Sequence, residues 1–140
     1  DEGFWDLVSV CKKPFVASHS NARMLCSHPR NLTDEMIRRL GEQGGVAGLN
    51  YYPEFLGEKL AVEDCMDALV RHAVHMINKG GSACVGLGSD FDGFRGEGRP
   101  ADAASQEDLI WAFHKAGLTE SEIDGILYQN VMRVYREVLR

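Results

Sequence analysis

Three polar residues, His19, Asn50 and Asp90, stand at the ends of short apolar segments, where their side chains could do chemistry. Imidazole is a common zinc ligand, and both imidazole and carboxylate can bind metal or transfer protons. Taken singly, a histidine at a strand end is more often an ordinary hydrogen-bonded residue, and an Asp in such a stretch is more often a turn residue. Because His19 and Asp90 occupy equivalent positions, the sequence favours a shared functional site.

The segments that carry these residues alternate with predicted helices. Residues 14–19, 46–50 and 83–88 are short and apolar, which predicts buried strands, whereas the periodicity of residues 34–42 and 61–78 predicts amphipathic helices. Fully apolar strands that alternate with helices are typical of a parallel sheet, so the fold class is α/β. The carboxyl ends of parallel strands meet at one edge, which would bring the three polar residues together.

The second half of the chain predicts two more helical stretches after a surface loop over residues 94–104. Ser105 and Thr119 each stand at an N-cap position, and Thr119 with Glu122 has the spacing of a full capping box. The final amphipathic helix is expected to end at Val138.

Composition excludes several function classes. The chain has 140 residues, 44% hydrophobic and 26% charged, with a net charge of −6, so neither nucleic acid nor anionic membrane is an expected partner. No apolar stretch approaches the roughly 20 residues of a membrane span, so we expect no membrane insertion by this segment. The cysteines stand singly, which favours reduced thiols and a cytoplasmic compartment. They are Cys11, Cys26, Cys65 and Cys84.

Four motifs together resemble the membrane (renal) dipeptidase family of zinc metallopeptidases. They are SHSNAR at 18–23, HPRNLT at 28–33, NYYP at 50–53 and GLGSDFDG at 86–93. The resemblance implies a TIM-like (β/α)₈ barrel with two bridged zinc ions at its mouth. It also implies hydrolysis of dipeptides by metal-bound hydroxide, often with tolerance of a D-residue at the C-terminal position.

The resemblance implies a role for four residues of this chain. His19 matches a histidine that ligates one zinc ion, and Asp90 matches an aspartate that contacts the metal-bound water and transfers its proton. Arg30 matches an arginine that grips the free carboxylate of the dipeptide, a task that suits its bidentate geometry. Phe55 falls where an aromatic residue lines the substrate site, although core packing is an equal reading of that position.

The departures from the family pattern matter equally. The family also uses an H-x-D pair, a bridging Glu and a second His, and none of these has a counterpart here. The whole chain, 1–140, therefore resembles the C-terminal portion of a barrel domain, about three β/α units covering strands six to eight. With one of five expected ligands, it is expected to bind no zinc tightly alone and to be inactive in isolation. The resemblance allows a homodimer of the complete enzyme.

The alternative is a catalytically incompetent fragment, or one half of a split barrel that needs a complementary chain. The first residue is Asp1 rather than Met, and residues 4–10 read as the end of a helix, so we expect that the start has been cut. Other site types find little support. His72 and His75 lack the spacing of a zinc-binding HExxH helix and predict a surface pair, while His28 could orient Arg30 or a ligand.

Overall fold

A three-stranded parallel sheet forms the centre of the computed structural model, which describes residues 1–94 and 100–139. The strands lie in the order β1 (Val16–Ala17), β2 (Val46–Asn50), β3 (Val85–Ser89). Every residue of the central strand β2 is buried, as its continuous apolar sequence predicts. The α/β class and the parallel sheet are confirmed.

Strand β1 is shorter than the predicted strand 14–19. Only Val16 and Ala17 pair with β2, opposite Val46 and Ala47. Beyond this pairing the chain still follows β2, since the amide of the residue after His19 donates to a backbone carbonyl of β2 over 2.7 Å. The short strand therefore still delivers His19 to the carboxyl edge of the sheet.

Strand β3 begins two residues later than the sequence predicts, because a 3₁₀ turn over Ser82–Cys84 precedes it. Its pairing with β2 shifts register between Leu49 and Asn50, so that Asn50 lies opposite Ser89. This irregularity falls where the polar residues of the site begin.

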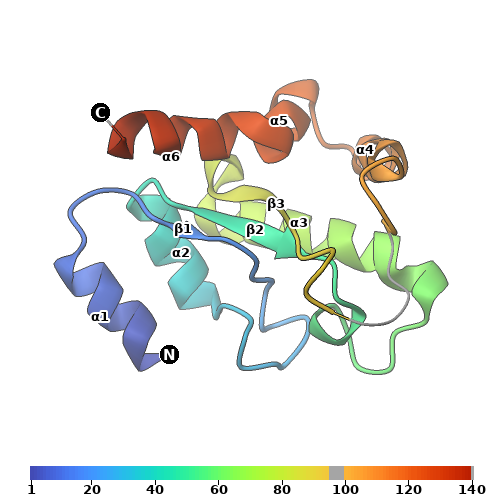
Figure 1. Ribbon diagram of the computed structural model, residues 1–140, viewed down its shortest axis with the longest axis horizontal. Coiled ribbons are helices and arrows are strands. Elements are labelled where there is room, and N and C mark those ends of the chain that lie inside the picture. The colour runs from blue at the N-terminus through green and yellow to red at the C-terminus, as the bar shows by residue number, and fades with distance from the viewer. Residues whose placement is uncertain (95–99, 140) are drawn as a thin grey trace.

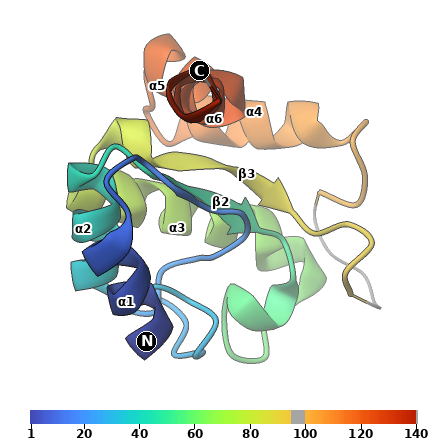
Figure 2. The same ribbon diagram turned by 60° about the vertical axis from the view of Figure 1, so that its left-hand side comes forward.

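Helices cover the sheet (Figures 1 and 2). Helices α2 and α3 lie on one side of the strands, and helices α5 (Glu120–Asp124) and α6 (Asn130–Val138) lie on the other. Helix α2 spans Asp34–Glu42, close to its predicted bounds, and Thr33 caps it by accepting the amide of Met36 over 3.2 Å. Helix α3 spans Cys65–Gly80 and follows a 3₁₀ turn over Val62–Asp64, where the sequence predicts a continuous helix.

The remaining elements described in the structure are helical. Helix α1 spans Glu2–Val10, helix α4 spans Gln106–Lys115 and helix α5 spans Glu120–Asp124. A π-helical segment, Gly125–Gln129, joins α5 to helix α6, Asn130–Val138. Helix α6 ends where the sequence predicts.

The two predicted caps have different outcomes. Thr119 and Glu122 form a full capping box, because each side chain bonds the backbone amide of the other. Ser105 is the N-cap residue of α4, as predicted, but its side chain does not cap the helix: its hydroxyl accepts the amides of Ala101 and Asp102 and makes no hydrogen bond to α4. The Ser105 side chain therefore stabilises the loop before α4 and leaves the first amides of the helix without a side-chain cap.

The core lies between the sheet and its helices, and Tyr51 and Phe113 are its largest fully buried side chains. Within the described ranges, no helix combines the length and hydropathy needed to cross a bilayer. The predicted loop 94–104 includes residues 95–99, which lie outside the described residues.

Candidate active site at the carboxyl edge of the sheet

The structure brings His19, Arg30 and Asp90 together at the carboxyl ends of the strands. Nε2 of His19 lies 2.9 Å from Nη2 of Arg30 and 4.0 Å from Oδ2 of Asp90. His19 follows β1, Asp90 follows β3, and Arg30 comes from the loop between β1 and α2. About a third of the His19 side chain and a quarter of the Asp90 side chain are exposed, so a ligand can reach both.

The hydrogen bonds of His19 fix which ring nitrogen carries the proton. A guanidinium can only donate, so Nε2 must accept from Arg30 in a neutral ring. Nδ1 therefore carries the hydrogen and donates it to Oγ of Ser18, 2.7 Å away. In this structure the lone pair of Nε2 is therefore taken by Arg30, and it would serve as a metal ligand only when the guanidinium moves away.

Asp90 occupies an uncommon backbone conformation. Its φ is 69° and that of Ser89 is 28°, both in the left-handed region that costs a residue with a side chain about 1 kcal/mol or more. Gly93 accommodates this turn, since a Cβ there would overlap the Asp90 carboxylate. The turn directs the carboxylate back over the sheet, where Nδ2 of Asn50 donates to its Oδ2 over 3.1 Å.

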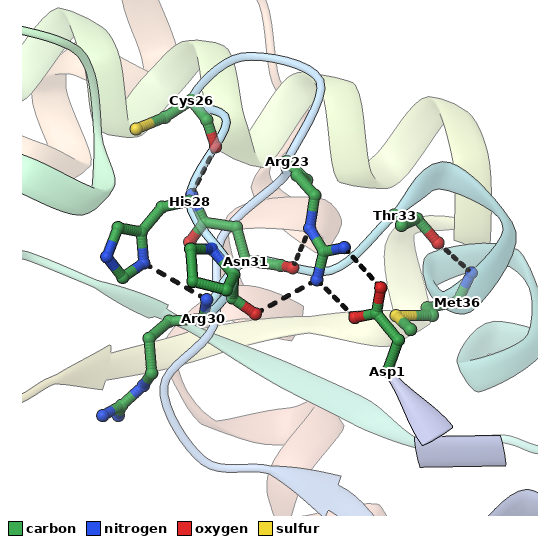
Figure 3. Close-up of polar contacts among 9 residues, drawn as sticks. Asp1, Arg23, Cys26, His28, Arg30, Asn31, Thr33 and Met36 are labelled. Atoms are coloured by element: carbon green, nitrogen blue, oxygen red, sulfur yellow. Dashed lines mark hydrogen bonds and ion pairs between the residues drawn. The ribbon is translucent and has the colours of Figure 1, made fainter. Parts of the chain in front are cut away.

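Phe55 lies beside Arg30. The guanidinium carbon of Arg30 is 5.6 Å from the centre of the Phe55 ring, which is a cation–π contact. The ring of His28 lies on the same phenyl group, with the two ring centres 4.4 Å apart. His28 also accepts the backbone amide of Arg30 at Nδ1 over 3.2 Å, so it contacts the arginine as predicted (Figure 3).

The loop that carries Arg30 is tied down by a second arginine. Arg23 makes a forked pair with the carboxylate of Asp1, at 2.6 and 2.7 Å, and its Nε donates to the carbonyl of Asn31 over 2.8 Å (Figure 3). The pair is partly exposed and contributes little stability by itself. Its geometry nevertheless joins the first residue of the chain to the loop of the site.

The predicted surface pair of His72 and His75 is wrong. His72 is buried, and burial lowers its pKa from 6.5 to about 4, so the ring is neutral at physiological pH. Its Nδ1 accepts the amide of Ala22, and its Nε2 donates to the carbonyl of Leu56. His75 bonds Asp34 over 2.7 Å. His72 therefore links α3 to the loops at Ala22 and Leu56, and His75 links α3 to the start of α2.

Sequence reasoning singled out Asn50 alone among three fully buried asparagines that lie beneath the site. They are Asn21, Asn31 and Asn50. Two of them stand within the motifs 18–23 and 28–33, next to residues with predicted roles, and the third ends β2. The available signal was that an asparagine stands within two residues of His19 and another stands next to Arg30.

The described residues do not form a zinc site by themselves. Within residues 1–94 and 100–139, no three His, Cys, Asp or Glu side chains lie close enough to hold one ion. A catalytic zinc needs about three protein ligands, and here one imidazole faces one carboxylate. Burial raises the pKa of Cys84 to about 11, which keeps that thiol protonated and unsuited to zinc.

Comparisons with known proteins agree on the family. The model of the membrane dipeptidase family, peptidase family M19, matches residues 1–140. An uncharacterised protein from the pqqA 5′ region of Klebsiella pneumoniae is 36% identical and matches 99% of this chain. A crystal structure of the dipeptidase AC, an M19 metallopeptidase, superposes with a TM-score of 0.90 at 32% identity over 98% of this chain.

A further crystal structure, of a metallopeptidase from Rhodobacter sphaeroides liganded with a phosphinate mimic of the dipeptide L-Ala-D-Ala, gives a TM-score of 0.87 at 31% identity and covers 98% of this chain. The chain spans 52% of the Klebsiella protein, 41% of the dipeptidase AC and 40% of the Rhodobacter peptidase. The match over every residue nevertheless settles its membership: the chain belongs to the membrane dipeptidase family, peptidase family M19.

Proposed function

We propose that this chain carries the substrate-carboxylate and proton-transfer side of a zinc dipeptidase site. The observation that carries the proposal is that Arg30 and Asp90 each approach Nε2 of His19 to within 4.0 Å at the carboxyl edge of the sheet, with Phe55 beside the arginine. These residues come from three separate segments. A cation, a carboxylate and an imidazole at one mouth suit hydrolysis of a small peptide with a free carboxylate.

Arg30 binds the terminal carboxylate of the dipeptide in this proposal. Its guanidinium lies over the Phe55 ring and donates to Nε2 of His19, a contact that it would exchange for the substrate carboxylate. A forked arginine–carboxylate pair is stronger and more directional than a lysine contact. Recognition of a free carboxylate close to the reacting carbonyl would restrict the substrate to dipeptides.

Asp90 moves the proton. As the attacking water forms its bond to the peptide carbonyl carbon, its proton passes to the Asp90 carboxylate. When the C–N bond breaks, Asp90 returns that proton to the leaving amine, so the carboxylate is regenerated. The hydrogen bond from Asn50 holds the carboxylate in place during both transfers.

Nε2 of His19 would hold zinc once Arg30 releases it, and the remaining ligands would come from segments outside these 140 residues. When bound in such a site, zinc activates water and polarises the carbonyl as a Lewis acid. In this proposal β1, β2 and β3 are strands six to eight of a (β/α)₈ barrel. The phosphinate-liganded Rhodobacter structure supports the choice of dipeptides with a C-terminal D-residue as the first substrates to test.

A second candidate is a catalytically incompetent piece that needs a complementary chain. The donor count favours it for the isolated chain, since the described residues offer fewer ligands than one zinc ion needs. The two candidates differ in what the chain does when the missing ligands are supplied.

Turnover of a dipeptide with a C-terminal D-residue, measured with added zinc, separates them. The isolated chain should neither hold equimolar zinc nor turn over. A hybrid in which residues 1–140 replace the matching 40% of the Rhodobacter peptidase should do both. Asp90→Asn in the hybrid should lower kcat by about 100-fold or more with zinc content unchanged. A hybrid that binds zinc but hydrolyses no dipeptide would refute the proposed function, and turnover by the isolated chain would refute the ligand count.

A further inference from the structure

Three buried asparagines connect the segments that carry the candidate site. We propose that Asn21, Asn31 and Asn50 are positioning residues of the dipeptidase, with Asn50 placing the proton-transfer group and Asn31 placing the substrate-binding group. The inference rests on the proposed function for the roles of Asp90 and Arg30, and on the geometry below for the network itself.

Asn50 has one orientation open to it. Its Oδ1 accepts the backbone amide of Tyr52 over 2.8 Å, so the amide group cannot flip without losing that bond. Nδ2 must therefore point to Asp90, where it donates to Oδ2 over 3.1 Å. This is the same oxygen that lies 4.0 Å from Nε2 of His19. Asn50 thus fixes the carboxylate oxygen that faces the reacting groups.

Asn21 links Asn50 to the loops. Its Oδ1 accepts the Asn50 backbone amide and its Nδ2 donates to the Asn50 carbonyl, both over 2.9 Å. The side-chain amide thereby occupies the place of a strand peptide where β1 has already ended. Nδ2 also donates to the carbonyl of Phe55 over 3.2 Å, so the end of β2 and the Phe55 segment are held by one side chain.

Asn31 extends the network beneath Arg30. Its Oδ1 accepts the Asn21 amide over 3.3 Å, and its Nδ2 donates to the carbonyls of Cys26 and Phe55, each over 2.9 Å. The Phe55 carbonyl therefore accepts from both asparagines. Because Asn31 directly follows Arg30 and contacts the Phe55 segment, it sets the position of the guanidinium against the ring.

Burial makes this network rigid. A buried amide that loses a partner costs roughly 1 to 3 kcal/mol, so each asparagine holds its neighbours to one arrangement. The network has two ends with different expected effects on catalysis. The Asn50 end reaches the proton-transfer group, and the Asn31 end reaches the groups that bind substrate.

Matched Asn→Asp substitutions in the active hybrid test the two ends, since each keeps the size of the side chain and replaces an N–H donor by a charged oxygen. Asn50→Asp should lower kcat by about 100-fold with KM changed less than about threefold, because the carboxylates repel and Asp90 moves. Asn31→Asp should raise KM by about tenfold or more with a smaller change in kcat. Asn78→Asp, exposed on α3, is the control for added charge and should change neither.

Equal losses in both variants, matching their loss of folded protein, would overturn the inference and leave the asparagines purely structural. If the wild-type hybrid has no activity, the proposed function fails, and the network is tested on the isolated chain by NMR. Asp90→Ala should then shift the side-chain NH₂ signals of Asn50 and leave those of Asn31 in place. Unchanged Asn50 signals would overturn the inference independently of any activity.

Discussion

His72 holds two loops of the candidate site from below. It accepts the amide of Ala22 and donates to the carbonyl of Leu56, which places it between the segment after His19 and the segment after Phe55. Both ring nitrogens are used in the neutral form, so a proton added at Nδ1 would remove an acceptor from a buried amide. The neutral ring is therefore part of the folded state.

This residue predicts a loss of stability in mild acid. The pKa of His72 is about 4 in the folded protein against 6.5 in the unfolded chain, because burial disfavours the charged ring. The unfolded state binds the extra proton between these values, so the free energy of unfolding falls as pH drops from about 6.5 toward 4, by at most about 3 kcal/mol. Asp34, whose pKa is lowered by Lys79 and His75, loses its contribution only below its unfolded value of 3.8.

Urea unfolding at a series of pH values between 4 and 7 measures this effect. His72→Gln should flatten the pH dependence in that window while lowering stability at pH 7. His114→Gln, at a partly exposed side chain on α4, should leave the dependence as it is in the wild type. A wild-type profile that is flat from pH 7 to pH 4 would contradict the account of His72.

At the scale of residues, the sequence predicts groups that face the substrate better than groups that support them. His19, Arg30, Phe55 and Asp90 belong to recognisable motifs or follow strands, and the structure brings the four together. The role of His72 could not be predicted, because its partners are backbone groups 50 and 16 residues away. A sequence pattern indicates which side chains are present, but it does not indicate which distant backbone groups they will contact.

At the scale of elements, helices α2 and α3 cross at a contact between two glycines. A Cβ on Gly41 would overlap the backbone carbonyl of Gly80, and a Cβ on Gly80 would lie 2.6 Å from Sγ of Cys84. Neither clash can be relieved by turning a flexible side chain, since backbone lies on one side of each. The crossing keeps α3, and with it His72, close to the sheet.

The crossing predicts opposite effects for two helical Gly→Ala substitutions. Gly41→Ala should destabilise the protein by about 1 to 3 kcal/mol through overpacking. Gly3→Ala, in the first turn of α1, meets no atom within 4 Å and should stabilise by up to about 1 kcal/mol through helix propensity. Urea unfolding gives both values. A neutral Gly41→Ala would show that α2 and α3 can separate without cost.

Elements with a local signal could be predicted, and elements set by distant contacts could not. Helix α2 has a cap, acidic residues in its first turn and an apolar stripe, and its bounds are confirmed. The π segment 125–129 has no such signal. It is followed by Asn130, whose side chain reaches back 48 and 45 residues to the carbonyls of Ser82 and Val85. Ser105 has the spacing of a cap, yet a local bond to Asp102 competes for its hydroxyl.

At the scale of the whole molecule, the described sheet has two outer strands, β1 and β3, that each pair on one side with β2. Beside β1 lies an apolar groove between residues 10–16 and the end of α6. Unpaired strand edges are places where further strands add. This architecture suits the proposal that other segments complete both the sheet and the metal ligands, as the longer relatives allow.

The central claim is that this chain binds the free carboxylate of a dipeptide through Arg30. NMR titration of the folded chain with a dipeptide and with its C-terminal amide tests it most directly, since the two ligands differ only in that charge. The dipeptide should shift signals of Arg30 and Phe55 and bind about 10- to 100-fold more tightly than the amide. Arg30→Ala should abolish the difference, whereas Arg39→Ala, at a partly exposed side chain on α2, should keep it. Equal binding of dipeptide and amide to the wild-type chain would contradict the account.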